Sequence, residues 1–116
     1  MDHLEQLNAA QDAINTERYA DALAILEPLC AIKDPTAQSM LGTLYQLGLG
    51  VPVNGAKAIS LLTAAAEKGN GVAAHNLGSI YVTGLPGVER DTERSRFYYR
   101  LARDLGAQFT QASFYE

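Results

Sequence analysis

Apolar residues recur at the same helical spacing in two separate stretches of the chain. The four positions are Ala37, Leu41, Leu44 and Tyr45 in the first stretch, and Ala73, Leu77, Ile80 and Tyr81 in the second, displaced by 36 residues. Residues three or four apart lie on one side of a helix, so each stretch predicts a helix with one apolar face. The intervening positions are mostly neutral and polar.

Glycines occur at equivalent places in both predicted helices. Gly42 and Gly78 fall inside the apolar pattern, where glycine costs about 1 kcal/mol relative to alanine. We therefore expect another helix to approach closely at these two positions. Gly48 and Gly84 follow the apolar pattern and predict the positive φ that ends a helix.

A second helix is predicted after each of these, displaced by 37 residues because the loop Leu85-Pro86-Gly87 contains one extra residue. It begins after Asn54 or Asp91, both of which are common N-cap residues. It ends near Gly69 or Gly106. It runs through Ala58, Leu61, Leu62 and Ala65 in one copy, and through Ser95, Tyr98, Tyr99 and Ala102 in the other.

A period of 36 residues with two helices per unit predicts a solenoid of stacked helix pairs. The pattern A-x-x-x-L-G-x-x-Y-x-x-G-x-G-V-x-x-D-x-x-K-A, followed by A-A-x-x-G, resembles Sel-1-like repeats and fits residues 37–69 and 73–106. Asn54 stands at the place of the aspartate in the first copy, and Ser95 stands at the place of the alanine of K-A in the second. This resemblance implies an all-α, right-handed α-α superhelix.

Residues 1–34 resemble a sister family, the tetratricopeptide repeat, and predict helices at about 3–15 and 18–31. The resemblance is carried by Ala10, Ala13, Tyr19, Ala22, Leu26, Pro28-Leu29 and Asp34-Pro35. We expect a single domain over 1–116, comprising this pair, Sel-1-like repeats at 35–70 and 71–106, and a short capping helix at 107–116. Phe109, Phe114 and Tyr115 in that last segment either cap the array or form a homodimer contact.

Charge is distributed unevenly along the 116 residues. Residues 1–34 carry seven acidic and two basic side chains, residues 35–88 carry only Lys57, Glu67 and Lys68, and residues 89–116 carry five of each sign. A net charge of −4 without a net-basic segment argues against nucleic acid as a partner. The charge-poor centre favours a protein interface, because such a surface costs little to desolvate; a plain neutral surface is the alternative.

The groove of such a solenoid is lined by the first helix of each pair. Side chains off the apolar face of these helices are the candidate partner-binding residues, and they are Asn8, Gln11, Ser39, Thr43, Gln46, His75, Asn76 and Ser79. Most are neutral hydrogen-bonding groups, which suit a peptide backbone. The tetratricopeptide resemblance implies that asparagine at Asn8 and Asn76 binds a ligand backbone, whereas Met40 interrupts that series.

Three further features have alternative interpretations. Arg96, Arg100 and Arg103 form one helical stripe, which either binds an acidic partner or keeps the outer face soluble. Cys30, the only cysteine, is expected to be a buried and unreactive thiol. His75 lacks a Cys, Asp or Glu at the third or fourth position after it, so we expect neither a metal nor a cofactor.

These features predict a protein–protein interaction module that acts as an adaptor, regulator or chaperone, and not an enzyme, since no nucleophile stands with its base in a known motif. The resemblance leaves two alternatives open, an immunity protein that covers a bacterial toxin and a binder or hydrolase of β-lactam-type molecules. The absence of a signal peptide and of an apolar run of about 20 residues predicts a cytoplasmic protein without a membrane contact. A single cysteine agrees with a reducing compartment, because secreted members of the family are rich in cysteine.

Overall fold

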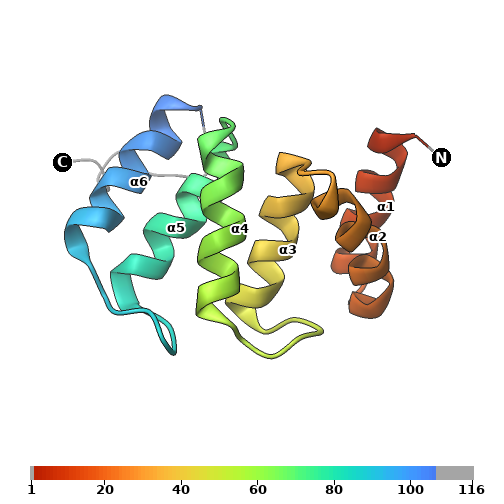
Figure 1. Ribbon diagram of the computed structural model, residues 1–116, viewed down its shortest axis with the longest axis horizontal. Coiled ribbons are helices and arrows are strands. Elements are labelled where there is room, and N and C mark those ends of the chain that lie inside the picture. The colour runs from red at the N-terminus through yellow and green to blue at the C-terminus, as the bar shows by residue number, and fades with distance from the viewer. Residues whose placement is uncertain (1, 107–116) are drawn as a thin grey trace.

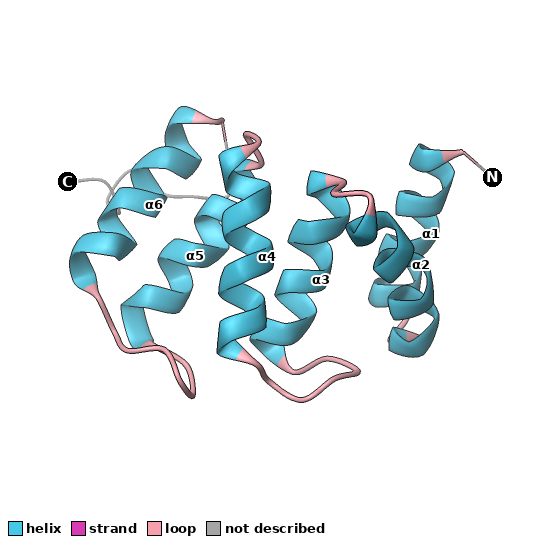
Figure 2. Ribbon diagram, in the orientation of Figure 1, coloured by secondary structure: helices cyan, strands magenta, loops and turns pink. Residues whose placement is uncertain are grey.

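Six helices of 13 residues each form three consecutive hairpins in the computed structural model, which describes residues 2–106 (Figure 1). The helices are α1 (His3–Asn15), α2 (Tyr19–Ala31), α3 (Pro35–Leu47), α4 (Gly55–Glu67), α5 (Gly71–Thr83) and α6 (Thr92–Asp104). Within residues 2–106 there is no strand, and one isolated bridge between Leu85 and Val88 closes the α5–α6 loop (Figure 2). The predicted all-α repeat architecture is therefore confirmed.

Most of the helices begin at a side chain that caps the first turn. The carboxylate or amide oxygen of Asp2, Asp34, Asn54, Asn70 or Asp91 accepts a hydrogen bond from the backbone N–H three residues later. This confirms the starts predicted at Asn54 and Asp91, and it satisfies one of the backbone donors left without a partner at a helix start. α2 differs, because Arg18 at its N-cap makes no capping hydrogen bond with its side chain.

The two hairpins at 35–70 and 71–106 are held by close contacts at glycine. A Cβ atom added to Gly42 would lie 2.8 Å from Cγ of Leu62, and one added to Gly78 would lie 2.7 Å from Cδ1 of Tyr99. Each contact joins the first helix of a pair to the second, as the sequence predicts. Gly48 and Gly84 end their helices at φ of 69° and 79°, which also agrees with the prediction.

The two tyrosines of the repeat occupy equivalent surroundings. The carbonyl of Tyr45 accepts a hydrogen bond from the N–H of Asn54, and that of Tyr81 accepts one from Asp91. Lys57 Nζ lies 5.0 Å from the centre of the Tyr45 ring, and the Arg94 guanidinium lies 5.7 Å from that of Tyr81. The two units therefore repeat in three dimensions as they do in sequence.

The interior consists of two apolar clusters that continue from unit to unit. The first joins α1, α2 and α3 through Ala10, Leu26, Leu29, Ala37, Leu41 and Leu44. The second joins α4, α5 and α6, with Leu62, Leu77 and Ile80 at its centre. Tyr45 packs against both clusters, so the core runs along the array without a break.

We expect Leu77→Ala to lower the free energy of unfolding by about 2–5 kcal/mol, because this side chain is fully buried and its removal leaves a cavity. Leu47→Ala is the matched control, since Leu47 is 56% exposed. Urea denaturation followed by circular dichroism measures both changes. Equal losses from the two substitutions would contradict the assignment of Leu77 to the core.

Candidate functional site

The first helices of the hairpins lie on the inner side of the array. α3 contacts both α1 and α5, whereas α2, α4 and α6 make no comparable contact with one another within residues 2–106. The stack therefore curves toward α1, α3 and α5. Figure 1 shows the successive hairpins lying side by side along the long axis of the molecule. This arrangement places a groove where the sequence predicts one.

The inner side contains a depression of about 250 Å³ between α1, α3 and α5. Its lining is mainly apolar and consists of Ile14, Met40, Leu44, Leu47, Leu49 and Val72, together with the neutral polar residues Gln11, Ser39, Thr43 and Asn76. None of these side chains is ionisable. Depressions on the outer surface differ in this respect, because Lys57 and Glu27 line one of them and Arg94 and Glu89 line another.

Three of the predicted groove residues are engaged with one another. Asn76 Nδ2 donates a hydrogen bond of 2.8 Å to Oγ1 of Thr43, which itself donates one of 2.8 Å to the backbone carbonyl of Ser39. The Ser39 side chain is buried. These polar groups therefore tie α5 to α3, which reduces what they can offer to a peptide backbone.

The other predicted groove residues are spread over a wider area. Asn8 and Gln11 are exposed on α1, and Gln11 donates a hydrogen bond to Asn15 within the same helix. Ser79 is half-buried on α5. Gln46 is also half-buried, and its Oε1 atom is buried without a hydrogen-bond partner within residues 2–106. The depression thus gathers Gln11, Ser39, Thr43 and Asn76, whereas Asn8, Gln46, His75 and Ser79 are not part of its lining.

His75 packs toward α6. Its ring lies 5.3 Å from that of Tyr99 in an edge-on arrangement. Burial lowers the pKa of His75 below its ordinary value of 6.5, and a hydrogen bond with Asn76 partly opposes that shift. Burial therefore favours the neutral form of the imidazole.

The apolar side chains of the groove are the part that the sequence reasoning missed. Leu47 and Val72 lie off the apolar face that packs the helices together and remain exposed, whereas Leu49 also packs against the cluster of α1, α2 and α3. The sequence did contain a signal, namely apolar residues at positions expected to face the groove. The predicted set contained only residues that can form hydrogen bonds, so it left these apolar residues out.

Cys30 is a free cysteine that is half-buried in α2. Burial, followed by the nearby Asp34 and Glu27 carboxylates, raises the pKa of the Cys30 thiol to about 11. Between residues 2 and 106, no three His, Cys, Asp or Glu side chains are grouped closely enough to hold a metal ion.

None of the six helices is both long and apolar enough to cross a membrane. The capping helix predicted over 107–116 lies outside the described residues.

A curved array of helix hairpins with a neutral, largely apolar inner groove defines an α-helical repeat scaffold. The model of the Sel1 repeat matches residues 35–70 and 71–106, and the chain belongs to this family. Sel1 repeat proteins are typically non-enzymatic scaffolds that generally bind other proteins. A comparison with curated protein sequences finds no match.

Solved structures that share the fold with this chain include two Sel1-type proteins. A Sel1 repeat protein from Oxalobacter formigenes is 32% identical over 83% of this chain, with a TM-score of 0.74. A protective antigen of uropathogenic Escherichia coli strains, which displays an SLR fold, is 30% identical over 87% of this chain, with a TM-score of 0.75. The chain spans 39% and 22% of the length of these two proteins, respectively.

The stability of the protein should fall as pH decreases through the range in which His75 titrates. The folded state holds the pKa of His75 below that of the unfolded chain, so protons bind the unfolded state preferentially below about pH 6.5. His75→Gln should reduce the loss of unfolding free energy between pH 7.5 and pH 5.5. Denaturation curves at both pH values test this, and an unchanged pH dependence in the variant would contradict it.

The Cys30 thiol should react slowly in the folded protein. With its pKa raised to about 11, only a small fraction is thiolate at pH 8, and the thiolate is the reactive form. We expect modification by a disulfide reagent to be at least about tenfold slower than in denaturant. Equal rates in the folded and denatured states would show that the Cys30 thiol is accessible to the reagent and that folding does not raise its pKa.

Proposed function

We propose that the chain binds a segment of another protein through apolar side chains that enter the groove between α1, α3 and α5. The observation that carries this proposal is the lining of that groove, which combines exposed leucine and valine with no ionisable side chain. Exposed apolar surface in a concave site is what a protein partner removes from water. Adaptor, regulatory and chaperone roles would all use this same contact.

Recognition through apolar side chains fits the groove better than capture of a peptide backbone. Thr43 and Asn76 hydrogen-bond to each other across α3 and α5, so only part of their hydrogen-bonding capacity is left for a ligand. Met40 occupies the middle unit at the place where the outer units have Asn8 and Asn76, and it lies in the lining. Its flexible thioether adapts readily to an apolar ligand. An amphipathic helix presents the side chains that such a site requires.

Substituting the exposed apolar residues should weaken partner binding while leaving the fold intact. Leu47 and Val72 are 56% and 47% exposed, so Leu47→Asp and Val72→Asp should change stability little. We expect each to lower the affinity for groove-binding peptides by at least about tenfold, because a carboxylate is placed in an apolar contact. Peptides selected from a random display library on the wild-type protein provide the ligand, and calorimetry measures the affinity.

Val53→Asp is the matched control, because Val53 is similarly exposed in the α3–α4 loop and lies outside the groove lining. The selected peptides should carry apolar residues at helical spacing and should bind the control variant normally. Peptides whose binding depends on Val53 and not on Leu47 or Val72 would overturn the assignment of the groove.

A further inference from the structure

The N-terminal face of the array carries acidic side chains where the later units carry buried apolar ones. In the register set by Ala10, Gly42 and Gly78, Glu5 stands at the place of Ala37, and Asp12 at the place of Leu44. Ala37 and Leu44 are buried in the cluster that joins α3 to α2. Glu5 and Asp12 are exposed. The face of α3 that packs on the preceding hairpin therefore has an exposed counterpart on α1, and this counterpart carries two carboxylates.

The opposite end shows the complementary substitution. Leu23 in α2 and Ile59 in α4 pack against the apolar clusters that join each unit to the next, and Arg96 occupies the equivalent place in α6. Ala66 is buried in the same way, and its equivalent in α6 is Arg103. The last described hairpin thus carries arginines at the positions through which the earlier hairpins contact their successors.

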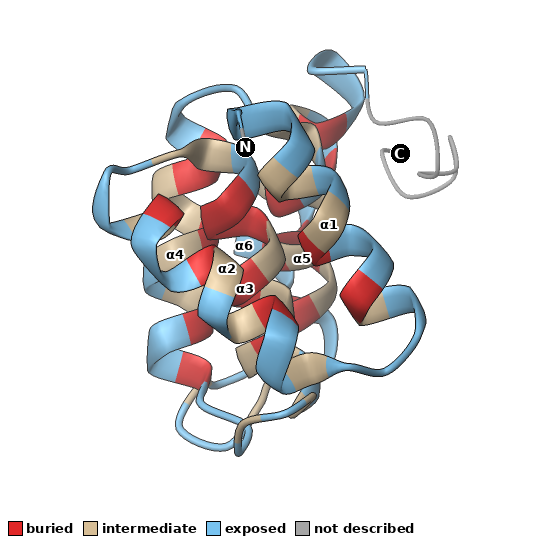
Figure 3. Ribbon diagram, turned by 90° about the vertical axis from the view of Figure 1, so that its right-hand side faces the viewer, coloured by how far each residue is buried: buried red, intermediate tan, exposed pale blue. Residues whose placement is uncertain are grey.

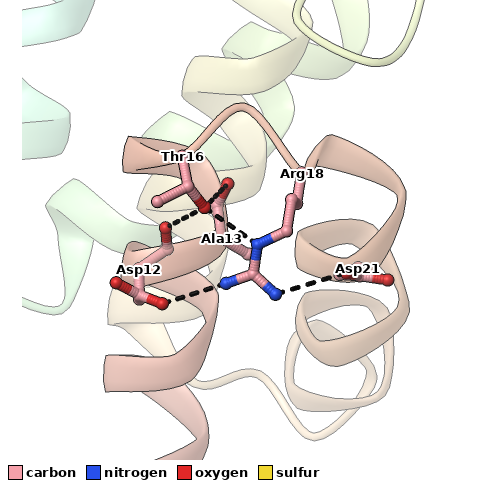
Figure 4. A network of polar contacts seen from close by, with 5 residues as sticks. All are labelled: Asp12, Ala13, Thr16, Arg18 and Asp21. Carbon is pink, nitrogen blue, oxygen red and sulfur yellow. Dashed lines mark hydrogen bonds and ion pairs between the residues drawn. The ribbon is translucent and has the colours of Figure 1, made fainter.

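The acidic face is seen end-on in Figure 3, where α1 and α2 lie toward the viewer and much of their surface is exposed. A depression of about 400 Å³ lies between these helices, and Ala9, Asp12, Arg18, Asp21 and Ala24 contribute to its lining. Arg18 lies between the two carboxylates, 2.9 Å from Asp12 and 3.5 Å from Asp21 (Figure 4). Asp12, Asp21 and Glu5 are negatively charged and Arg18 is positively charged, so this face has a net negative charge.

The basic face is formed by the outward stripe of α6. A depression of about 370 Å³ is lined by Glu93, Arg96, Phe97, Arg100, Leu101 and Asp104. Phe97 is 60% exposed at the place that Ser60 occupies in α4. Neither Arg96 nor Arg100 forms an ion pair within residues 2–106. The stripe therefore offers an exposed aromatic ring flanked by two arginines that form no ion pair in this part of the chain, and Glu93 and Asp104 lie at the edge of the same depression.

We propose that the protein associates with a second copy of itself head to tail, the α1–α2 face of one copy lying on the α6 face of the next. Glu5 and Asp12 of one copy would face Arg96 and Arg103 of the other, in the register that apolar residues use between units within the chain, with Arg100 beside them on the same helical stripe. A contact between two different faces is heterologous and continues into longer assemblies unless it closes into a ring. The opposite signs of the two faces favour this occupant over an unrelated acidic protein, since both halves of the contact are present on one molecule.

This association is independent of the proposed groove, because the two faces share none of their charged residues with its lining. Stacking in the internal register would place the groove of one copy beside that of the next. The contact should weaken as salt increases, since exposed charges are screened over about 8 Å at physiological ionic strength.

Complementary charge reversal tests the proposal on the full chain. Arg96→Glu with Arg100→Glu makes both faces acidic, and Glu5→Arg with Asp12→Arg makes both faces basic. Each double variant alone should associate at least about tenfold more weakly than the wild type. A one-to-one mixture should regain association, because each face then meets an opposite charge. Sedimentation velocity over a wide concentration range, at low and high salt, measures all four samples.

Glu67→Arg with Glu89→Arg is the matched control, since it changes net charge as Glu5→Arg with Asp12→Arg does, at two exposed positions away from both faces. This control should associate like the wild type, and circular dichroism should show all variants folded. A wild-type chain that remains monomeric at every concentration in low salt would overturn the proposal. So would a mixture of folded variants that fails to associate, or variants that associate as strongly as the wild type.

Discussion

The close approach of paired helices at Gly42 and Gly78 is the constraint on which the rest of the structure depends. Leu62 and Tyr99 pack directly over these glycines at distances that leave no room for a Cβ atom. The hairpins can therefore close tightly. The apolar side chains of the first helices are then buried in the core, and they include Leu41, Leu44, Leu77 and Ile80. Glycine inside a helix costs stability because of its low helix propensity. The burial of apolar side chains along the whole array offsets that cost.

The groove follows from the same packing. Once each hairpin is closed and stacked, the first helices contact one another along the inner side and the second helices remain apart. The inner helices meet partly through the polar link from Asn76 to Thr43 and partly through apolar residues that extend past the contact into solvent. The surface left over is neutral and apolar. A surface of this kind is one that a protein partner removes from water, and Sel1 repeat proteins generally bind other proteins.

Much of this fold could be predicted from sequence, because a repeat states each structural requirement twice. The caps at Asn54 and Asp91, and the close contacts at Gly42 and Gly78, were recognisable from their recurrence at a fixed period. The site was less accessible for a physical reason. Helical spacing identifies which side chains leave the packed face, but it does not show that Thr43 bonds to Asn76 from the next unit. Nor does it show that Ser39 is buried, or that Leu47 and Val72 stay exposed.

The sign of the stability change in Gly42→Ala, measured by urea denaturation, tests this account most directly. Alanine at an unobstructed position in a helix would raise the free energy of unfolding by about 1 kcal/mol. The added methyl would lie 2.8 Å from the buried Leu62 side chain. We therefore predict that Gly42→Ala lowers the free energy of unfolding by about 1–3 kcal/mol. The same substitution should cost less in a chain that already carries Leu62→Ala, because the clash is then absent. A gain in stability from Gly42→Ala would show that the helices are not held together at this glycine and would contradict the account.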